Sequence, residues 1–384
     1  MEKEKTQPKI DYMIVLLMIL FVIYSCIAIY SANSAYVTKQ IVWYVIGLVA
    51  ILVTMIIDFD RFRQISWILY GLGMLLLLGL EIIPEGDFVK NINGATSWYQ
   101  FPGGLGSFQP SEVMKIFLII LLSQIVFRHN EKYPIRTFKE DLMLFMKIIL
   151  ISGPPLLLVM MQPDLGTAMV LSAIIASIIL VSGIKWRYIA ALFFSVILVI
   201  SVVVLIYFLN FDFFVEYFLG GDSNSYTLGR FYGWLAPYEY PTQGFQLLQS
   251  LLAIGSGELI GRGYMTEGVR IPESHTDFIF AIIAEEFGFI GACLLISIFF
   301  LLIYRIIHTA LESNDPYGSY LCTGIIGMIT FQVFQNIGMT IGLLPITGIP
   351  LPFISYGGSS LLTYMIAIGI VLNVRSRTIK FMFD

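Results

Sequence analysis

Three carboxylates in an otherwise apolar stretch, IPESHTDFIFAIIAEEFGFIGA at residues 271–292, are the side chains best suited to chemistry in this sequence. Asp277 opens the apolar part, and Glu285 and Glu286 lie inside it. A two-carboxylate glycosidase site needs its groups about 5–9.5 Å apart, whereas eight residues of helix span about 12 Å. The spacing therefore favours a lone carboxylate at a helix mouth, with Glu285 and Glu286 in a buried polar network behind it. Asp277 as a simple helix cap is the alternative.

The composition places these groups in a membrane protein. Of the 384 residues, 58% are hydrophobic and 12% charged, whereas a soluble domain is about one quarter charged. An ionisable side chain in hydrocarbon costs roughly 3 kcal/mol or more, so each one inside an apolar run is a functional candidate. We expect no nucleic-acid partner, because no basic surface pattern is visible. The scattered His and Cys residues show neither metal-ligand nor disulfide spacing.

About ten apolar runs are long enough to cross the ~30 Å hydrocarbon layer. Basic residues gather on the side of the N-terminus, which predicts that both termini are cytoplasmic. The predicted fold is an all-α polytopic membrane protein forming a single domain over residues 1–384. The predicted spans lie near residues 11–31, 40–57, 64–83, 111–127, 141–161, 165–183, 188–209, 277–304, 318–343 and 358–374.

The long connection at residues 210–276 is predicted to be extracellular, between the seventh and eighth helices. It is rich in aromatic residues and glycine, so we expect it to be folded. Its segment QGFQLLQSLLAIGSG has the spacing of a short interfacial helix. The glycine-dense AIGSGELIGRG at residues 253–263 would let backbone N–H groups approach an anion, with Arg262 and Arg270 adding charge, although this signal is weak on its own.

Other polar segments lie near the predicted outer face. Glu112 and Lys115 share a helix face and can pair, either as a structural pair or as part of a polar cavity. Asp164 follows a proline in QPDLGT, where capping the next helix is the favoured role. In GIPLPFISYGGSS at residues 348–360, proline and glycine interrupt an apolar region, and such irregular backbone lines protein or a water-filled cavity.

Taken together, these segments resemble the SEDS family (shape, elongation, division and sporulation), the polytopic glycosyltransferases of bacterial peptidoglycan synthesis typified by RodA and FtsW. The resemblance extends over essentially the whole chain. It departs at Thr96 and Ser97, where the family usually has a basic residue, and at Glu258, a position that is commonly glycine. The matching segments are NGA at 93–95 with Trp98, QPSEVMK at 109–115, QPDLGT at 162–167, AIGSG at 253–257 with GRG at 261–263, PESHTDFIFAIIAEEFG at 272–288, and NIGMTIGLLPITGIPLPFISYGGSS at 336–360.

The resemblance implies polymerisation of lipid II into glycan strands on the extracytoplasmic face of the bacterial plasma membrane, beside a class B penicillin-binding protein. The family's essential aspartate falls on Asp277, and one carboxylate suffices to take the proton of the attacking hydroxyl. The departing undecaprenyl pyrophosphate needs positive charge, from side chains or a metal. A divalent cation (Mg or Mn) at Asp277 is left open. The expected substrate-binding residues are Glu112, Lys115, Asp164, Arg230, Arg262, Arg270, Ser355 and Gly357.

The leading hypothesis is a RodA-type polymerase specific to elongation, which the short termini favour. Two alternatives stay open. One is a division-type FtsW homologue. The other is a flippase for lipid-linked precursors, which would also be a multi-span bundle with internal charges. A carboxylate at an external helix mouth beside a long folded loop favours the enzyme over the flippase.

Overall fold

The computed structural model describes residues 11–84, 86, 88–89, 96–100, 107–209, 226–266 and 268–378. Within them the protein is mainly a bundle of long helices, and each predicted apolar run coincides with one of them. The helices are α1 (Tyr12–Asn33), α2 (Val37–Ile56), α3 (Phe59–Ile82), α4 (Pro110–Lys132), α5 (Phe138–Met161), α6 (Leu165–Val181), α7 (Trp186–Leu209), α11 (Ile279–Glu312), α12 (Pro316–Thr340) and α13 (Gly358–Arg377).

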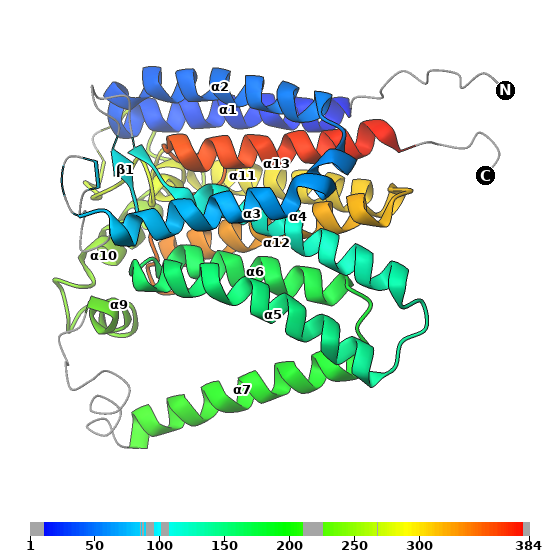
Figure 1. Ribbon diagram of the computed structural model, residues 1–384. Helices are drawn as coiled ribbons and strands as arrows, with labels where there is room; N and C mark the ends of the chain where they lie inside the picture. Colours follow the sequence, from blue (N-terminus) through cyan, green and yellow to red (C-terminus); the bar gives the residue numbers. More distant parts are fainter. Residues whose placement is uncertain are drawn as a thin grey trace.

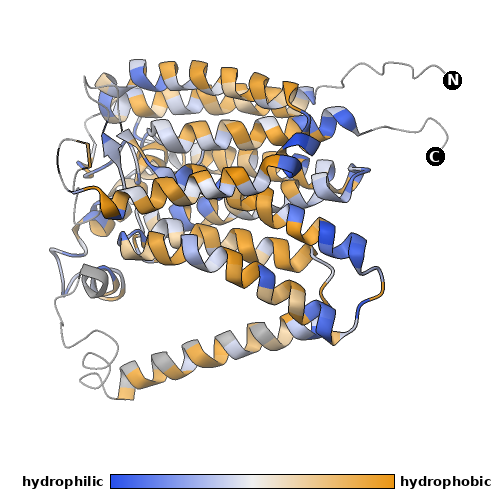
Figure 2. Cartoon of the chain, viewed as in Figure 1, coloured by the Kyte–Doolittle hydropathy of each residue, from blue (hydrophilic) through white to orange (hydrophobic). Residues whose placement is uncertain are grey.

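The lengths of these helices identify a multi-pass membrane fold. In the described part of the chain, 7 stretches are long and apolar enough to cross a membrane, with α1 and α2 counted as one stretch. Figure 1 shows that α1 begins and α13 ends at the same end of the bundle. Hydrophilic residues gather at that end, while the helix faces between the two ends are largely hydrophobic (Figure 2). This pattern agrees with the predicted polytopic fold.

Short elements cover the opposite end of the bundle (Figure 1). The predicted interfacial helix is present as α10 (Phe245–Ser256), and α9 (Tyr226–Leu235) precedes it. A small antiparallel hairpin pairs β1 (Tyr99–Gln100) with β2 (Ser107–Phe108), so the fold is not strictly all-α as predicted. Within the 210–276 connection, residues 210–225 and 267 lie outside the described residues.

Helix α4 is the core of the bundle. Its residues are buried on nearly every side, and it packs against α3, α12, α13, α6 and α5. A helix that is apolar on its outer face meets lipid, whereas one surrounded by other helices can carry polar residues that pair with each other. The position of α4 therefore explains why it tolerates buried polar side chains at Glu112, Lys115 and Gln124.

Helix α11 is broken at Gly288, a feature that the hydropathy pattern does not predict. Gly288 has φ 63° and ψ −163°, a conformation open mainly to glycine. The segment 258–263 is inserted at the break and bonds to both halves of the helix. Its amides at residues 262 and 263 donate to the carbonyls of residues 285 and 286, at 2.9 and 3.2 Å. Its carbonyls at residues 258 and 259 accept from the amides of residues 289 and 290, at 2.9 and 3.1 Å. On α11, the carbonyls of residues 285 and 286 and the amides of residues 289 and 290 therefore keep partners despite the break. A membrane protein requires such pairing of its backbone groups.

Candidate active site

Asp277 lies in the loop that leads into α11. The N-cap residue of α11 is Phe278, and no side chain caps this helix. The alternative that Asp277 serves only as the N-cap is therefore wrong. Asp277 is half-buried, and no described residue donates a hydrogen bond to its carboxylate. This side chain therefore lies in a loop at one end of the bundle, with no donor from the described residues on its oxygens.

The backbone around Asp277 is fixed by one polar side chain on α12 and another in the segment that follows it. Asn336 donates from Nδ2 to the carbonyls of Asp277 and Ile349, both at 2.8 Å. The Ser355 hydroxyl donates to the Thr276 carbonyl at 2.6 Å and accepts from the amide of residue 351 at 2.8 Å. Ser355 was predicted to bind substrate, but its contacts make it a residue that positions Asp277. Asn336 does the same, and the sequence reasoning missed it.

Burial and nearby charges raise the pKa of Asp277 from its ordinary 3.8 to about 7. Desolvation is the largest cause, and the negative charges of Glu273 and Asp164 raise the pKa further. Arg230, on α9, lowers it. A carboxylate whose pKa is close to the working pH is well matched to general-base catalysis. Because their charges act on Asp277, Arg230 and Asp164 lie near it. Both are predicted site residues.

An aromatic cluster stands beside this loop, and the sequence reasoning missed it. Tyr36 stacks on His275 with ring centroids 4.5 Å apart, and Tyr356 lies 4.5 Å from Tyr36. Lys39 Nζ is 5.6 Å from the centre of the Tyr36 ring. Burial lowers the pKa of His275, which favours its neutral form. All three rings are half-buried, so the cluster forms a partly open aromatic surface two residues from Asp277.

Glu285 and Glu286 form the predicted polar network. Glu285 accepts from the amide of Val269 at 2.9 Å and pairs with Arg262 Nη1 at 3.3 Å. Glu286 accepts from the hydroxyl of Ser31 on α1. The two glutamates therefore tie the loop at residues 262–269 and α1 to the first half of α11. Arg262 already has a carboxylate partner inside the protein, so its contact with a pyrophosphate stays a prediction.

The glycine-dense segment at residues 253–263 does not form the predicted anion cradle. A Cβ at Gly257 would lie 2.0 Å from the Ala284 carbonyl oxygen, and a Cβ at Gly261 would lie 2.0 Å from that of Glu286. These glycines are needed for close packing against α11, whose carbonyls already occupy the amides of residues 262 and 263. Glu258 stands at φ 47°, which explains why glycine suits its position.

Glu112 and Lys115 form the predicted pair, and it is sealed inside the bundle. Their charged atoms are 2.7 Å apart, and the side chains are only 4% and 1% exposed. Lys115 also lies over the ring of Tyr364, 5.6 Å from its centre. The burial agrees with the structural alternative, and we correct the prediction that these two residues bind substrate, because neither can reach a ligand in this conformation.

The remaining predicted residues lie around the same end of the bundle. Asp164 caps α6, accepting from the Thr167 amide at 2.9 Å, and it also accepts from Gln109 Nε2 at 2.9 Å. Gly357 is the N-cap residue of α13. Arg270 is exposed. At the departure from the family pattern, Ser97 is buried and donates to the Gln162 carbonyl at 3.3 Å, while residues 93–95 lie outside the described residues.

A resident metal ion is not supported by the side chains at Asp277. Within the described ranges, no group of three or more His, Cys, Asp or Glu residues is arranged to hold one. Glu273 and Asp164 act on Asp277 through their charge and make no ligand cluster with it.

Comparison with known proteins identifies the family. The family of FtsW, RodA and SpoVE, described as "Cell cycle protein", matches residues 8–380. The chain belongs to this FtsW/RodA/SpoVE family. The SEDS family predicted from the sequence motifs is thereby confirmed.

Relatives in the FtsW/RodA/SpoVE family extend over almost the whole chain. Stage V sporulation protein E of Bacillus subtilis is 36% identical over 97% of this chain and 98% of its own length. A probable peptidoglycan glycosyltransferase FtsW of Geobacter metallireducens is 34% identical over 96% of this chain and 95% of its own. These names agree with the predicted enzyme class, peptidoglycan glycosyltransferase, and they do not confirm the RodA type.

Solved structures of the FtsW/RodA/SpoVE family have the same fold. The rod shape determining protein RodA of Thermus thermophilus has a TM-score of 0.68 at 26% identity, covering 97% of this chain and 98% of its own. A component of a peptidoglycan synthase complex has a TM-score of 0.77 at 28% identity, covering 95% of this chain and 97% of its own. The multi-pass membrane fold is therefore that of the family.

Proposed function

We propose that this member of the peptidoglycan glycosyltransferase family polymerises lipid II into glycan strands, with Asp277 as the general base. One observation carries the proposal. The Asp277 carboxylate is half-buried, receives no hydrogen bond from a described residue, and has a pKa of about 7. A helix cap or a structural ion pair would engage those oxygens, whereas a base that must accept a substrate proton needs them unoccupied.

The proposed reaction is a direct displacement. The 4-hydroxyl of the acceptor GlcNAc attacks C1 of the donor MurNAc, and its proton passes to the Asp277 carboxylate. The bond between C1 and the pyrophosphate oxygen breaks, so undecaprenyl pyrophosphate leaves with the electron pair and the configuration at C1 inverts. Pyrophosphate is a good leaving group and needs no proton donor, which is why one carboxylate is enough.

The leaving group carries negative charge that the protein must balance. Arg230 is the cation best placed for this role, because its charge acts on Asp277. Arg270 is exposed on the same outer segment. We assign Arg230 to the pyrophosphate and Ser355 and Asn336 to positioning the loop that bears Asp277. The half-buried rings of Tyr36, His275 and Tyr356 offer a surface on which a sugar ring can pack.

We propose that the end of the bundle bearing Asp277 faces the outside of the plasma membrane. The support is the concentration of basic residues near the other end, where the positive-inside rule places the cytoplasm. We also propose a class B penicillin-binding protein as the partner, since a similar chain belongs to a peptidoglycan synthase complex that coordinates polymerization and crosslinking.

For the cellular process, the sequence prediction is elongation. A division- or sporulation-type role is the second candidate, because relatives at 34% and 36% identity carry the names FtsW and stage V sporulation protein E. Complementation separates the two roles: rescue of a RodA-depleted strain supports elongation, and rescue of an FtsW-depleted or SpoVE-deficient strain supports the second candidate.

The test of the chemistry uses purified protein, alone and with its cognate transpeptidase, and fluorescent lipid II. We expect glycan chains on a gel from the wild type and a loss of at least about 100-fold in rate for Asp277→Asn, the typical contribution of a general base. Glu239→Gln, at an exposed turn of the outer segment, is the matched control and should polymerise normally. Polymer made at the wild-type rate by Asp277→Asn would refute the assignment. Transfer of labelled lipid across liposomes without any polymer would support the flippase instead.

A further inference from the structure

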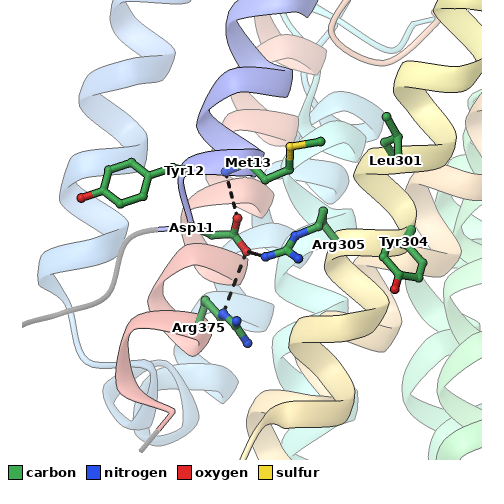
Figure 3. A pocket seen from close by; sticks show the side chains of 7 residues that line it. All are labelled: Asp11, Tyr12, Met13, Leu301, Tyr304, Arg305 and Arg375. Atoms are coloured by element: carbon green, nitrogen blue, oxygen red, sulfur yellow. Dashed lines mark hydrogen bonds and ion pairs between the residues drawn. The ribbon is translucent and has the colours of Figure 1, made fainter. Parts of the chain in front are cut away.

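A cavity of about 610 Å³ lies at the end of the bundle opposite Asp277, where α1 begins and α13 ends. Three helices far apart in the sequence line it (Figure 3). They contribute Asp11–Met13 at the start of α1, Leu301, Tyr304 and Arg305 on α11, and Arg375 on α13. The proposed glycosyl transfer uses none of these residues, so the cavity requires a separate explanation.

The lining of the cavity contains two arginines and one carboxylate. Asp11 Oδ2 lies 2.5 Å from Arg305 Nη2 and 3.9 Å from Arg375 Nε, and Figure 3 shows the carboxylate pointing between the two guanidinium groups. The same carboxylate caps α1, accepting from the amides of Met13 and Ile14 at 3.1 and 3.3 Å. The Asp11 carboxylate therefore pairs with two arginines and also caps the N-terminus of α1. Formal charges on the lining sum to one positive charge, although Arg375 also pairs with Glu312 outside it.

Arg305 also carries a donor that the described protein does not use. Its Nε atom is buried and has no hydrogen-bond partner in the described residues. Leaving a buried N–H unpaired is destabilising, more so in a charged group. The buried Nε is not reached from the cavity, but the Arg305 side chain lines it and is 24% exposed, so an acceptor there meets the accessible part of the side chain. A guanidinium binds phosphate oxygens especially well, because its donors lie in one planar fork.

The rim of the cavity carries exposed apolar and aromatic side chains on a helix long and apolar enough to cross a membrane. Leu301 is 38% exposed and Tyr304 52% exposed on α11. Leu301 and Arg305 are four residues apart, so they share a helix face, with Leu301 one turn closer to the bilayer centre. Tyrosine and arginine at a helix end are typical of the membrane interface. This order, an arginine at head-group level and a leucine below it, matches a phosphate joined to an acyl chain.

We propose that this cavity binds the phosphate of one anionic phospholipid, such as phosphatidylglycerol. The head-group phosphodiester bonds Arg305 and Arg375, and one acyl chain lies along Leu301. With the predicted orientation, the lipid comes from the cytoplasmic leaflet, whose anionic head groups attract basic residues near the ends of spans. The lipid would join α1, α11 and α13, the three helices that line the cavity.

The test measures lipid retention by native mass spectrometry on the purified full chain. Delipidated protein is given phosphatidylglycerol or phosphatidylcholine in detergent. We expect one phosphatidylglycerol to bind at about tenfold lower concentration than phosphatidylcholine. The double variant Asp11→Asn/Arg305→Gln, which removes a charge pair together, should lose this preference. Arg377→Gln is the matched control, because Arg377 stands in the same last turn of α13 but pairs with Asp58 at 2.7 Å outside the cavity.

A second variant tests the cavity independently, in case the double variant fails to fold. Leu301→Trp fills the lipid side of the cavity without touching a charge, and it should also abolish the preference for phosphatidylglycerol. Equal retention of the two lipids by the wild type would overturn the proposal, as would full retention of phosphatidylglycerol by both cavity variants. Inorganic phosphate that displaces phosphatidylglycerol at equal concentration would also overturn it, because the ligand would then be a soluble phosphate.

Discussion

The raised pKa of Asp277 predicts a steep pH dependence of glycan polymerisation. Only the deprotonated carboxylate can accept the proton of the attacking hydroxyl. With a pKa of about 7, about one-tenth of the protein is active at pH 6 and about nine-tenths at pH 8. The rate at saturating lipid II should therefore rise about tenfold over this range. A carboxylate at its ordinary 3.8 would give a flat profile over the same range.

Charge variants determine whether Asp277 is the titrating group. Glu273 raises the pKa of Asp277 and Arg230 lowers it. Glu273→Gln should therefore move the midpoint of the profile to lower pH, and Arg230→Gln should move it to higher pH. Glu239→Gln, the control, should leave it unchanged. Titration of lipid II itself is common to all variants, so a set of identical midpoints, or a flat wild-type profile, would refute the reasoning.

The free energy of unfolding should also depend on the protonation of Asp277. Unlike the polymerisation rate, it should fall as the pH rises. Because the folded protein holds the Asp277 proton more tightly than the unfolded chain, the stability it contributes is present below pH 4 and is lost as the pH rises through about 7. The shift from 3.8 to about 7 corresponds to at most about 4 kcal/mol, less whatever solvent on its exposed side removes. The melting temperature of Asp277→Asn should therefore rise relative to wild type between pH 5 and pH 8. A constant difference would contradict the raised pKa.

Three further predictions concern positions around this site. Gly288→Ala should lower the melting temperature markedly, because φ is positive and a Cβ would lie 2.3 Å from a backbone nitrogen of the inserted segment, whereas Gly255→Ala, with nothing within 4 Å of the new Cβ, should not. Lys115→Met should cost about 3–5 kcal/mol by leaving Glu112 charged and unpaired, and Lys115→Met/Glu112→Leu should recover most of it in a denaturation assay. Ser355→Ala should lower kcat more than it changes KM in a polymerisation assay, since Ser355 positions the base.

Hydropathy was sufficient to predict the long helices. Their positions follow from a simple requirement, since about 20 apolar residues cross the hydrocarbon and every backbone group must be paired within the helix. The buried pair of Glu112 and Lys115 was predictable for a similar reason, because three residues of helix bring the two groups together. The cap at Asp164 was also predicted correctly from its position before an apolar run.

Contacts between distant segments were not predictable. Nothing in the spacing of AEEFGF indicates that the chain leaves the helix at Gly288, because glycine is common in membrane helices. The pairing of Arg262 with Glu285 was not predictable for the same reason, since the two residues are 23 positions apart. Asn336 and Ser355 lie in segments noted for their motifs, yet their bonds to the loop of Asp277 depend on how α12 and the following segment fold back.

The segment inserted into α11 makes the outer loop and the broken helix a single unit. If residues 258–263 were withdrawn, four backbone groups would lose their partners, at about 1–3 kcal/mol for each one left unpaired. An antibody fragment or cyclic peptide that pulled this segment outward would therefore distort the first half of α11 and the loop that bears Asp277 without binding to Asp277 itself. Exchanging this loop between homologues would likewise require exchanging the first turns of α11 with it.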